Sequence, residues 1–299
     1  LNFDVADNMK VRLGAARTLA RPRMDQLNAS SNASIANQPQ GALNSIFSGS
    51  GGNPQLRPYV ADGVDLSYEW YFGGEGYLAI AGYYKWLKDF VNPNAAVVRD
   101  FAYLVPSLSG DSLTAFNQSG QQTLGFVTGP DNGAEGHIAG IEATLALPFR
   151  MFAPGLDGFG FQTSVSYTDS ELTVTPPTGA SFSVDVPGLS KWVVNSTVYF
   201  DKSGFEARLS HRYRTKFLAE FIGISASRAF RETYPESIFD AQIGYRFQED
   251  SALNGLSVTV QALNLTDEPF INFQNGDRDQ IIDYERYGRT YLVGASYRF

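Results

Sequence analysis

The sequence contains no cysteine and only two histidines, and both shortages narrow the chemistry open to the chain. Without cysteine there is no disulfide, thiolate metal ligand or thiol nucleophile. His137 and His211 leave little material for imidazole chemistry, and we expect both to be ordinary loop or interfacial residues. No Ser–His pairing suited to a lipase stands out. We therefore expect no enzyme, no metal site and no cofactor.

Positive charge and long apolar runs are also scarce. Lys and Arg number 23 against 31 Asp and Glu, a net charge of −8. Nucleic-acid binding needs clustered basic residues, so no such partner is expected. No stretch of 18 apolar residues exists, which excludes a transmembrane helix. The mean hydropathy of −0.19 does not exclude a transmembrane barrel, because only alternate residues of a barrel strand face lipid.

Aromatic residues and glycine are abundant, at 14% aromatic and 29 glycines, a mixture typical of strands and turns. Eleven segments alternate apolar with polar or small residues, the pattern of half-buried strands. The clearest is 63–72, where Val64, Leu66, Tyr68, Trp70 and Phe72 share one face. The others lie at 1–5, 9–19, 77–86, 141–147, 159–165, 192–200, 205–212, 239–247, 256–262 and 290–299.

The connections between these segments alternate in length. Short turns are expected at 6–8, 73–76, 149–158, 201–204 and 249–255. Long loops are expected at about 20–60, 90–136, 170–190, 218–236 and 265–286. A β-sandwich mixes its loop lengths, whereas an outer-membrane barrel has short turns on one rim and long extracellular loops on the other. Aromatic residues near the short turns fit a membrane-interface girdle, although the core of a soluble sandwich is the alternative.

The segment count predicts that the chain is part of a larger barrel. A membrane-crossing strand needs roughly 9–11 residues, yet only five precede the first turn. Bacterial single-chain barrels have even strand numbers, and eleven is odd.

Several motifs add a family resemblance. They are Arg17-Thr18-Leu19-Ala20-Arg21-Pro22, 52–58 (GNPQLRP), Ala139-Gly140-Ile141-Glu142, Pro187-Gly188-Leu189-Ser190 and Asn264-Leu265-Thr266-Asp267-Glu268-Pro269. With the closing strand from Tyr291, they resemble, in order, the C-terminal part of TonB-dependent outer-membrane receptors. The likeness is strongest to the branch common in Xanthomonas- and Caulobacter-like bacteria.

The resemblance implies an all-β, transmembrane, antiparallel up-and-down barrel of about 22 strands, of which residues 1–299 form one partial barrel domain. It implies an outer-membrane location, a lumen filled by a plug domain, and energy supplied through the plug by TonB, ExbB and ExbD. We expect the plug and its TonB box to lie outside this chain. The alternating last strand, with Tyr291, Val293, Ala295, Tyr297 and Phe299 on one face, resembles the signal read by the barrel-assembly machinery.

Along the predicted strands, charged residues occupy the positions that alternate with the apolar ones, and these residues form the predicted lumen surface. Contact with the plug and the barrel wall is favoured over direct ligand binding. The set is Arg12, Asp65, Glu69, Lys85, Glu142, Glu206, Arg208, Arg212, Arg246 and Arg298.

Ligand capture is expected in the extracellular loops. Candidate residues are Phe101, Tyr103, Phe116, Phe221, Phe230, Arg231, Tyr234, Phe273, Asp277, Arg278 and Tyr284. Aromatic faces with nearby polar groups suit sugar rings and, with Arg, ferric siderophores. The branch resemblance favours an oligosaccharide, with a siderophore as the alternative. Some of these aromatic residues are expected to pack loops against one another. Rival functions are a passive porin or adhesin and a secreted β-rich carbohydrate-binding protein.

Overall fold

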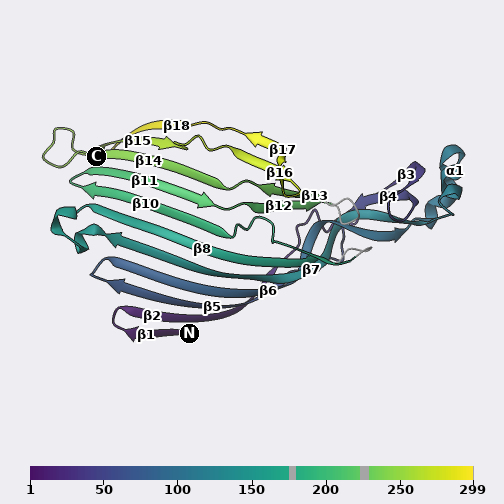
Figure 1. The fold of residues 1–299 in the computed structure, drawn as a ribbon, viewed down its shortest axis with the longest axis horizontal. Coiled ribbons are helices and arrows are strands. Elements are labelled where there is room, and N and C mark those ends of the chain that lie inside the picture. The colour runs from purple at the N-terminus through teal and green to yellow at the C-terminus, as the bar shows by residue number, and fades with distance from the viewer. Residues whose placement is uncertain (175–179, 223–228, 299) are drawn as a thin grey trace.

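Eleven antiparallel strands form one continuous curved wall in the computed structural model, which describes residues 1–174, 180–222 and 229–298 (Figure 1). The side chains of residues 93, 94, 221, 222 and 229 are also outside this description. The strands follow chain order: β1 (Asn2–Ala6), β2 (Met9–Ala20), β5 (Tyr59–Phe72), β6 (Gly76–Asp100), β7 (Leu124–Pro148), β8 (Phe159–Val174), β10 (Trp192–Lys202), β11 (Phe205–Arg214), β14 (Glu236–Arg246), β15 (Leu256–Leu263) and β18 (Thr290–Tyr297). The predicted eleven segments are confirmed. The wall is a partial barrel that does not close on itself.

Short turns gather at one end of the wall and long connections at the other (Figure 1). The β7–β8 turn carries two short 3-10 helices, η2 (Phe149–Met151) and η3 (Pro154–Leu156). None of the described helices is long and apolar enough to cross a membrane.

The long connections contain more structure than the sequence pattern predicts. The prediction of a loop over 90–136 is wrong, because β6 continues to Asp100 and β7 begins at Leu124. Where a hairpin projects beyond the wall, water reaches both of its faces and period-two alternation is no longer required. Strands also occupy parts of 20–60, 170–190, 218–236 and 265–286.

The projecting end of the β6–β7 hairpin carries a small packed unit, which we call the arm (Figure 1). It adds β3 (Ser31–Gln40), β4 (Ser45–Gly51), η1 (Ala102–Ser107) and α1 (Gly110–Gln118). β4 pairs in parallel with β7, through Ser48↔Phe126 to Ser50↔Thr128. Its own core is made by Ile46, Phe47, Phe101, Leu108, Ala115 and Phe116.

A second, four-stranded sheet lies at the long-connection end of the second half of the wall (Figure 1). It consists of β12 (Phe217–Ile222), β13 (Ala229–Thr233), β16 (Phe270–Gln274) and β17 (Asp277–Glu285). A short strand, β9 (Phe182–Val184), pairs with the end of β8. The segment after it folds against the polar face of the wall, where Val186 packs with Leu87, Leu172 and Leu218.

Candidate ligand-uptake site

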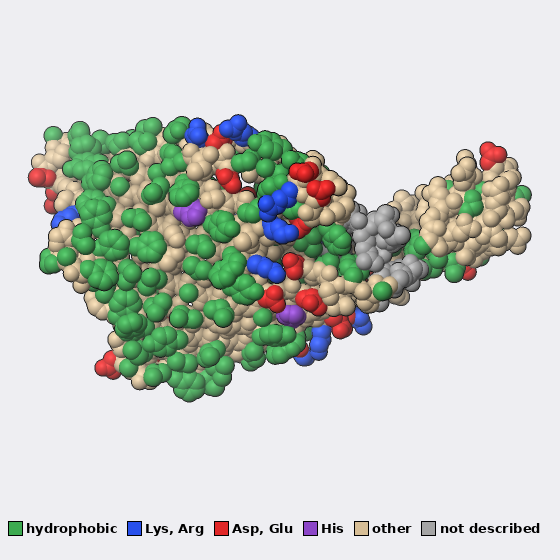
Figure 2. All heavy atoms as spheres, viewed as in Figure 1, with side chains coloured by type: hydrophobic (Ala, Val, Ile, Leu, Met, Phe, Trp, Pro, Cys, Tyr) green, Lys and Arg blue, Asp and Glu red, His purple; other side chains and the backbone are tan. Residues whose placement is uncertain are grey.

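One face of the wall is predominantly apolar. Cross-strand registers bring Leu66 opposite Leu13, Val198 opposite Leu209, and Val260 opposite Val293. These side chains are exposed, with Leu209 at 48% and Val293 at 79%, and hydrophobic side chains cover this face (Figure 2). Contiguous exposed apolar surface of this kind marks a membrane-facing or protein-interaction surface.

Aromatic pairs border the apolar face at both ends. Near the short turns, the rings of Trp70 and Phe72 lie 4.6 Å apart and those of Phe159 and Phe200 4.5 Å apart. At the other end, Tyr84 packs against Trp86 at 4.6 Å and Tyr167 against Trp192 at 4.9 Å. The sequence pattern predicts only the first girdle. Two girdles are the pattern of a barrel wall that spans a bilayer.

The two histidines both lie on this apolar face, near the second girdle. His211 stacks on Phe239 at 4.3 Å, and its Nε2 lies 3.0 Å from the Ser237 hydroxyl. His137 stacks on Tyr84 and lies 3.6 Å from Asp169. His211 matches the interfacial position expected for it, whereas His137 lies within β7, paired on both sides, and not at a loop end.

The opposite face of the wall is polar and carries the predicted lumen charges. Strand registers place Arg12, Asp65, Glu69, Lys85, Glu142, Glu206, Arg208, Arg212 and Arg246 on it, and Arg298 follows β18 with the same parity. Arg12 pairs with Glu69 at 2.8 Å and Arg212 with Asp240 at 3.2 Å. Within the described chain, Arg208, Arg246 and Arg298 make no ion pair. Contact with a plug stays a prediction.

Glycines keep this polar face smooth. Each of five glycines is the direct cross-strand partner of a larger side chain that lies over it. The pairs are Gly14 with Asp65, Gly63 with Lys85, Gly140 with Tyr83, Gly160 with Tyr199, and Gly244 with Glu206. An added Cβ at Gly140 would lie 2.6 Å from the Tyr83 hydroxyl. Large side chains therefore lie along the wall instead of projecting into the lumen.

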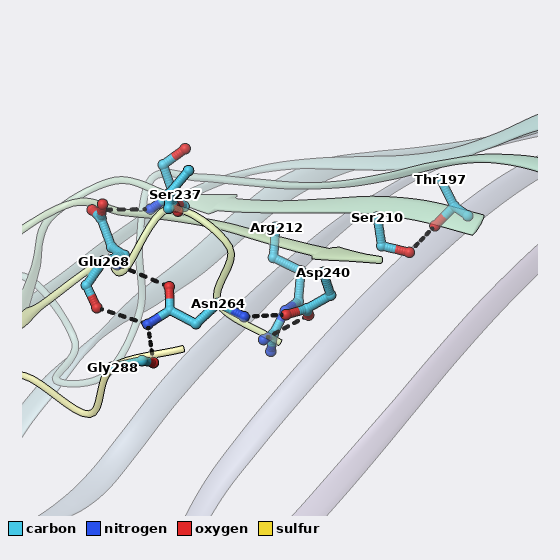
Figure 3. Close-up of polar contacts among 9 residues, drawn as sticks. Thr197, Ser210, Arg212, Ser237, Asp240, Asn264, Glu268 and Gly288 are labelled. Carbon is cyan, nitrogen blue, oxygen red and sulfur yellow. Dashed lines mark hydrogen bonds and ion pairs between the residues drawn. The ribbon is translucent and has the colours of Figure 1, made fainter. Parts of the chain in front are cut away.

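A hydrogen-bonded corner joins the polar face to the loops (Figure 3). The Asn264 backbone N–H donates to Asp240 Oδ1 at 2.9 Å, and Asp240 also holds Arg212. The Asn264 amide donates to the carbonyls of Glu268 and Gly288, both at 3.2 Å, and its Oδ1 accepts from the Glu268 N–H at 2.8 Å. Asn264 has φ +52°, a left-handed conformation that Asn tolerates better than most residues.

A cavity of 380 Å³ lies beside this corner, lined in part by Arg212, Asp240, Glu268 and Tyr287. Beyond the wall, hydrogen bonding to Asp267 raises the pKa of the Arg286 guanidinium. Hydrogen bonding to Glu285 raises the pKa of the Tyr287 phenol. Because Asn264 contacts both Asp240 of β14 and Gly288 before β18, the Asn264–Pro269 motif organises a wall-to-loop junction. Its sequence alone does not reveal this role.

The predicted ligand residues separate into three groups. Phe101 and Phe116 are buried in the arm core, whereas Tyr103 is 69% exposed. Phe230 packs against the apolar cluster around Val186. Arg231, Tyr234, Phe273, Asp277, Arg278 and Tyr284 belong to the second sheet or its connections, and the Phe221 side chain lies outside the described residues.

Within the second sheet, several of these residues contact one another. The Tyr234 hydroxyl donates to the Arg278 carbonyl at 2.9 Å, and its ring meets Phe273 edge-on at 5.0 Å. Arg231 lies 3.3 Å from Glu220. Phe273 is 1% exposed and cannot reach a ligand directly, whereas Tyr284 is 57% exposed and can. No three His, Asp or Glu side chains among the described residues converge as a metal site would require.

The closing strand presents Tyr291, Val293, Ala295 and Tyr297 on the apolar face. Phe299, the last residue of the predicted assembly signal, lies outside the described residues. Its role in assembly stays a prediction.

These features define a section of a transmembrane antiparallel β-barrel, with a lipid-facing side, a polar lumen side and structured extracellular loops. The family model for the TonB dependent receptor-like β-barrel matches residues 1–265. The chain therefore belongs to the TonB-dependent receptor β-barrel family, whose members are integral proteins of the bacterial outer membrane.

Solved structures show the same fold. A mutant of the ferric enterobactin receptor PfeA from Pseudomonas aeruginosa, in complex with enterobactin, superposes with TM-score 0.66 at 16% identity, covering 99% of this chain and 39% of that one. The siderophore receptor PirA from Acinetobacter baumannii gives 0.65 at 16%, covering 100% and 40%. The ferric citrate transporter FecA, unliganded, gives 0.61 at 12%, covering 99% and 37%.

The chain thus spans about two fifths of the length of these solved receptors. The comparison with curated proteins finds no similar sequence.

Proposed function

We propose that this chain forms the C-terminal half of the barrel of an energised outer-membrane receptor, which captures a scarce nutrient in its loops and imports it. The observation that carries the proposal is the two-faced wall, apolar toward lipid and polar toward the lumen, topped by folded loops. TonB, with ExbB and ExbD, would act through a plug seated against the polar face. The barrel-assembly machinery would read the closing strand. This is transport rather than catalysis.

We propose a neutral oligosaccharide as the ligand. The arm is almost free of charge: residues 26–55 contain no charged side chain, and 101–130 contain only Asp111. Residues 264–289, which include half of the second sheet, carry six acidic side chains and three basic ones. Such loops attract anionic ligands poorly, whereas Asn, Gln and Ser side chains hydrogen-bond well to hydroxyls.

A ferric siderophore is the second candidate. The neighbours named above favour it, since their names refer to ferric enterobactin, siderophores and ferric citrate. The superpositions support a shared fold, and the low sequence identity leaves the ligand open. Because acidic side chains outnumber basic ones in residues 264–289, these loops would then favour a siderophore complex without net negative charge.

Uptake by cells tests both candidates. Cells with and without the full-length receptor gene would be given radiolabelled neutral oligosaccharides or ⁵⁵Fe-siderophores, with tonB present or deleted. We expect receptor- and TonB-dependent accumulation of a sugar. Iron accumulation alone would replace the sugar by a siderophore. Accumulation that persists without tonB would indicate a passive porin and contradict the energised mechanism.

A further inference from the structure

A cavity of 480 Å³ opens on the lumen side of the wall and shares no lining residue with the cavity at the Asn264 corner. It is lined by residues of β2, β5, β6 and β7, with Val186 from the segment after β9. Its size falls within the roughly 300–1,000 Å³ usual for small-molecule sites. None of the eleven loop residues predicted to bind ligand lines it.

The walls of this cavity are mainly apolar and aromatic. Ala61, Leu87 and Ile138 come from neighbouring strands, and Val186 closes one side. Leu87 and Val186 are buried in the apolar cluster that anchors the inward-folded segment after β9, so this side of the cavity is held in place by packing. Tyr59 and Phe90 add two rings 6.0 Å apart, inclined at 49°.

Two opposite charges border the apolar surface. Asp65 lies over Gly14, and the Lys85 side chain lies over Gly63, where an added Cβ would be 3.2 Å from Lys85 Cγ. Asp65 makes no hydrogen bond or ion pair within the described chain, and the Lys85 ammonium lies 5.5 Å from the centre of the Tyr83 ring. The cavity therefore offers one strong acceptor and one strong donor without committed partners, beside a hydrophobic surface.

This combination suits a ring with one apolar face and hydroxyls at its edge. A carboxylate accepts hydrogen bonds from hydroxyls, and an ammonium donates to them. An anionic ring would meet repulsion from Asp65, and a purely aromatic ring would leave both charges without partners.

We propose that this cavity is a lumen-wall subsite that binds one pyranose ring of the transported oligosaccharide, with Asp65 and Lys85 as specificity-determining residues. The inference rests on the proposed function and adds a place where sugar contacts the wall after loop capture.

The test uses the full-length receptor, with its plug, purified in detergent. Maltohexaose, cellohexaose and xylohexaose serve as probes in isothermal titration calorimetry. Asp65→Asn, Lys85→Met and Tyr59→Ala are compared with Asp250→Asn and Lys202→Met, which alter charges at the short turns. Circular dichroism melting and protease resistance of the plug report folding separately.

We expect at least one hexaose to bind, with affinity about tenfold or more lower in each cavity variant, since each loses a charged hydrogen bond or a ring contact. The control variants should bind like the wild type. Sugar binding unchanged in all three cavity variants would overturn the subsite and leave the proposed function standing. Wild-type receptor that binds no hexaose would overturn both the sugar ligand and the subsite. Cavity variants that release the plug without altering sugar affinity would assign the cavity to the plug.

Discussion

At the scale of single residues, Asn264 is the side chain on which the wall-to-loop junction depends most. It combines a positive φ with contacts to Asp240, Glu268 and Gly288, which belong to β14, the loop after β15 and the connection before β18. The motif is visible in the sequence, but two of its partners, Asp240 and Gly288, are not, because each lies 24 residues from Asn264.

Asn264→Ala should loosen this junction. It removes the three amide hydrogen bonds and places alanine at φ +52°, which together should cost about 1–3 kcal/mol locally. Limited proteolysis of the full receptor in outer membranes should then show faster cleavage within 265–289. Asn254→Ala, in a short turn, is the control. Equal cleavage in both variants would contradict the role given to Asn264.

At the scale of elements, strand pairing decides what a glycine does. Gly140 and Gly82 lie on adjacent strands but on opposite faces of the wall. Gly140 lies beneath the Tyr83 ring, whereas a Cβ at Gly82 would meet no atom closer than 3.8 Å.

Gly140→Ala should therefore destabilise the barrel by about 1–3 kcal/mol, because both the Tyr83 ring and the Tyr167 carbonyl obstruct the new methyl group. Gly82→Ala should stay within about 0.5 kcal/mol of the wild type. Urea unfolding in lipid vesicles, followed by tryptophan fluorescence, measures the difference. Equal losses would mean that the glycine pairing does not shape the lumen wall.

The arm is an element whose packing is largely separate from the wall. Phe116 is 6% exposed and meets Phe47 edge-on at 6.0 Å. Phe116→Ala should cost about 3–5 kcal/mol within the arm, so protease should cut within 101–123 while the heat-modifiable migration of the barrel persists. Leu113→Ala, a partly exposed neighbour on α1, is the control. Loss of heat-modifiability would show instead that arm and wall unfold together.

The sequence predicts those strands that have one face toward lipid, because such strands must alternate apolar and polar residues. All eleven wall strands follow alternation, since one face must be apolar and the other polar. The arm and the second sheet were missed because neither faces lipid: Ser31–Gln40 and Phe270–Gln274 alternate weakly and sit within expected loops. Burial likewise separates Phe101 and Phe116 from exposed Tyr103, and only the fold reveals it. The cavity beside Lys85 joins residues from four strands and has no local signal.

At the scale of the whole molecule, the account rests on the assignment of one face to lipid and the other to the lumen. Adjacent residues of β11 test the energetic consequence. Leu209→Arg should destabilise the barrel in bilayers by about 2–4 kcal/mol, the depth-dependent cost of a lipid-facing cation. Ser210→Arg should be tolerated, since Ser210 lies on the polar face, where its hydroxyl is 2.9 Å from that of Thr197 (Figure 3). Similar losses in the two variants would contradict the assignment.

The most direct measurement is spin-label accessibility along β11. The absence of cysteine allows single cysteines to be placed within this chain at each position from 206 to 211. In the full receptor in bilayers, labels at 207, 209 and 211 should be relaxed by oxygen, which concentrates in lipid. Labels at 206, 208 and 210 should respond little to oxygen. Where water reaches the lumen, they should instead be relaxed by a water-soluble nickel chelate. An oxygen response without a two-residue period, or with the opposite phase, would contradict the membrane-spanning wall.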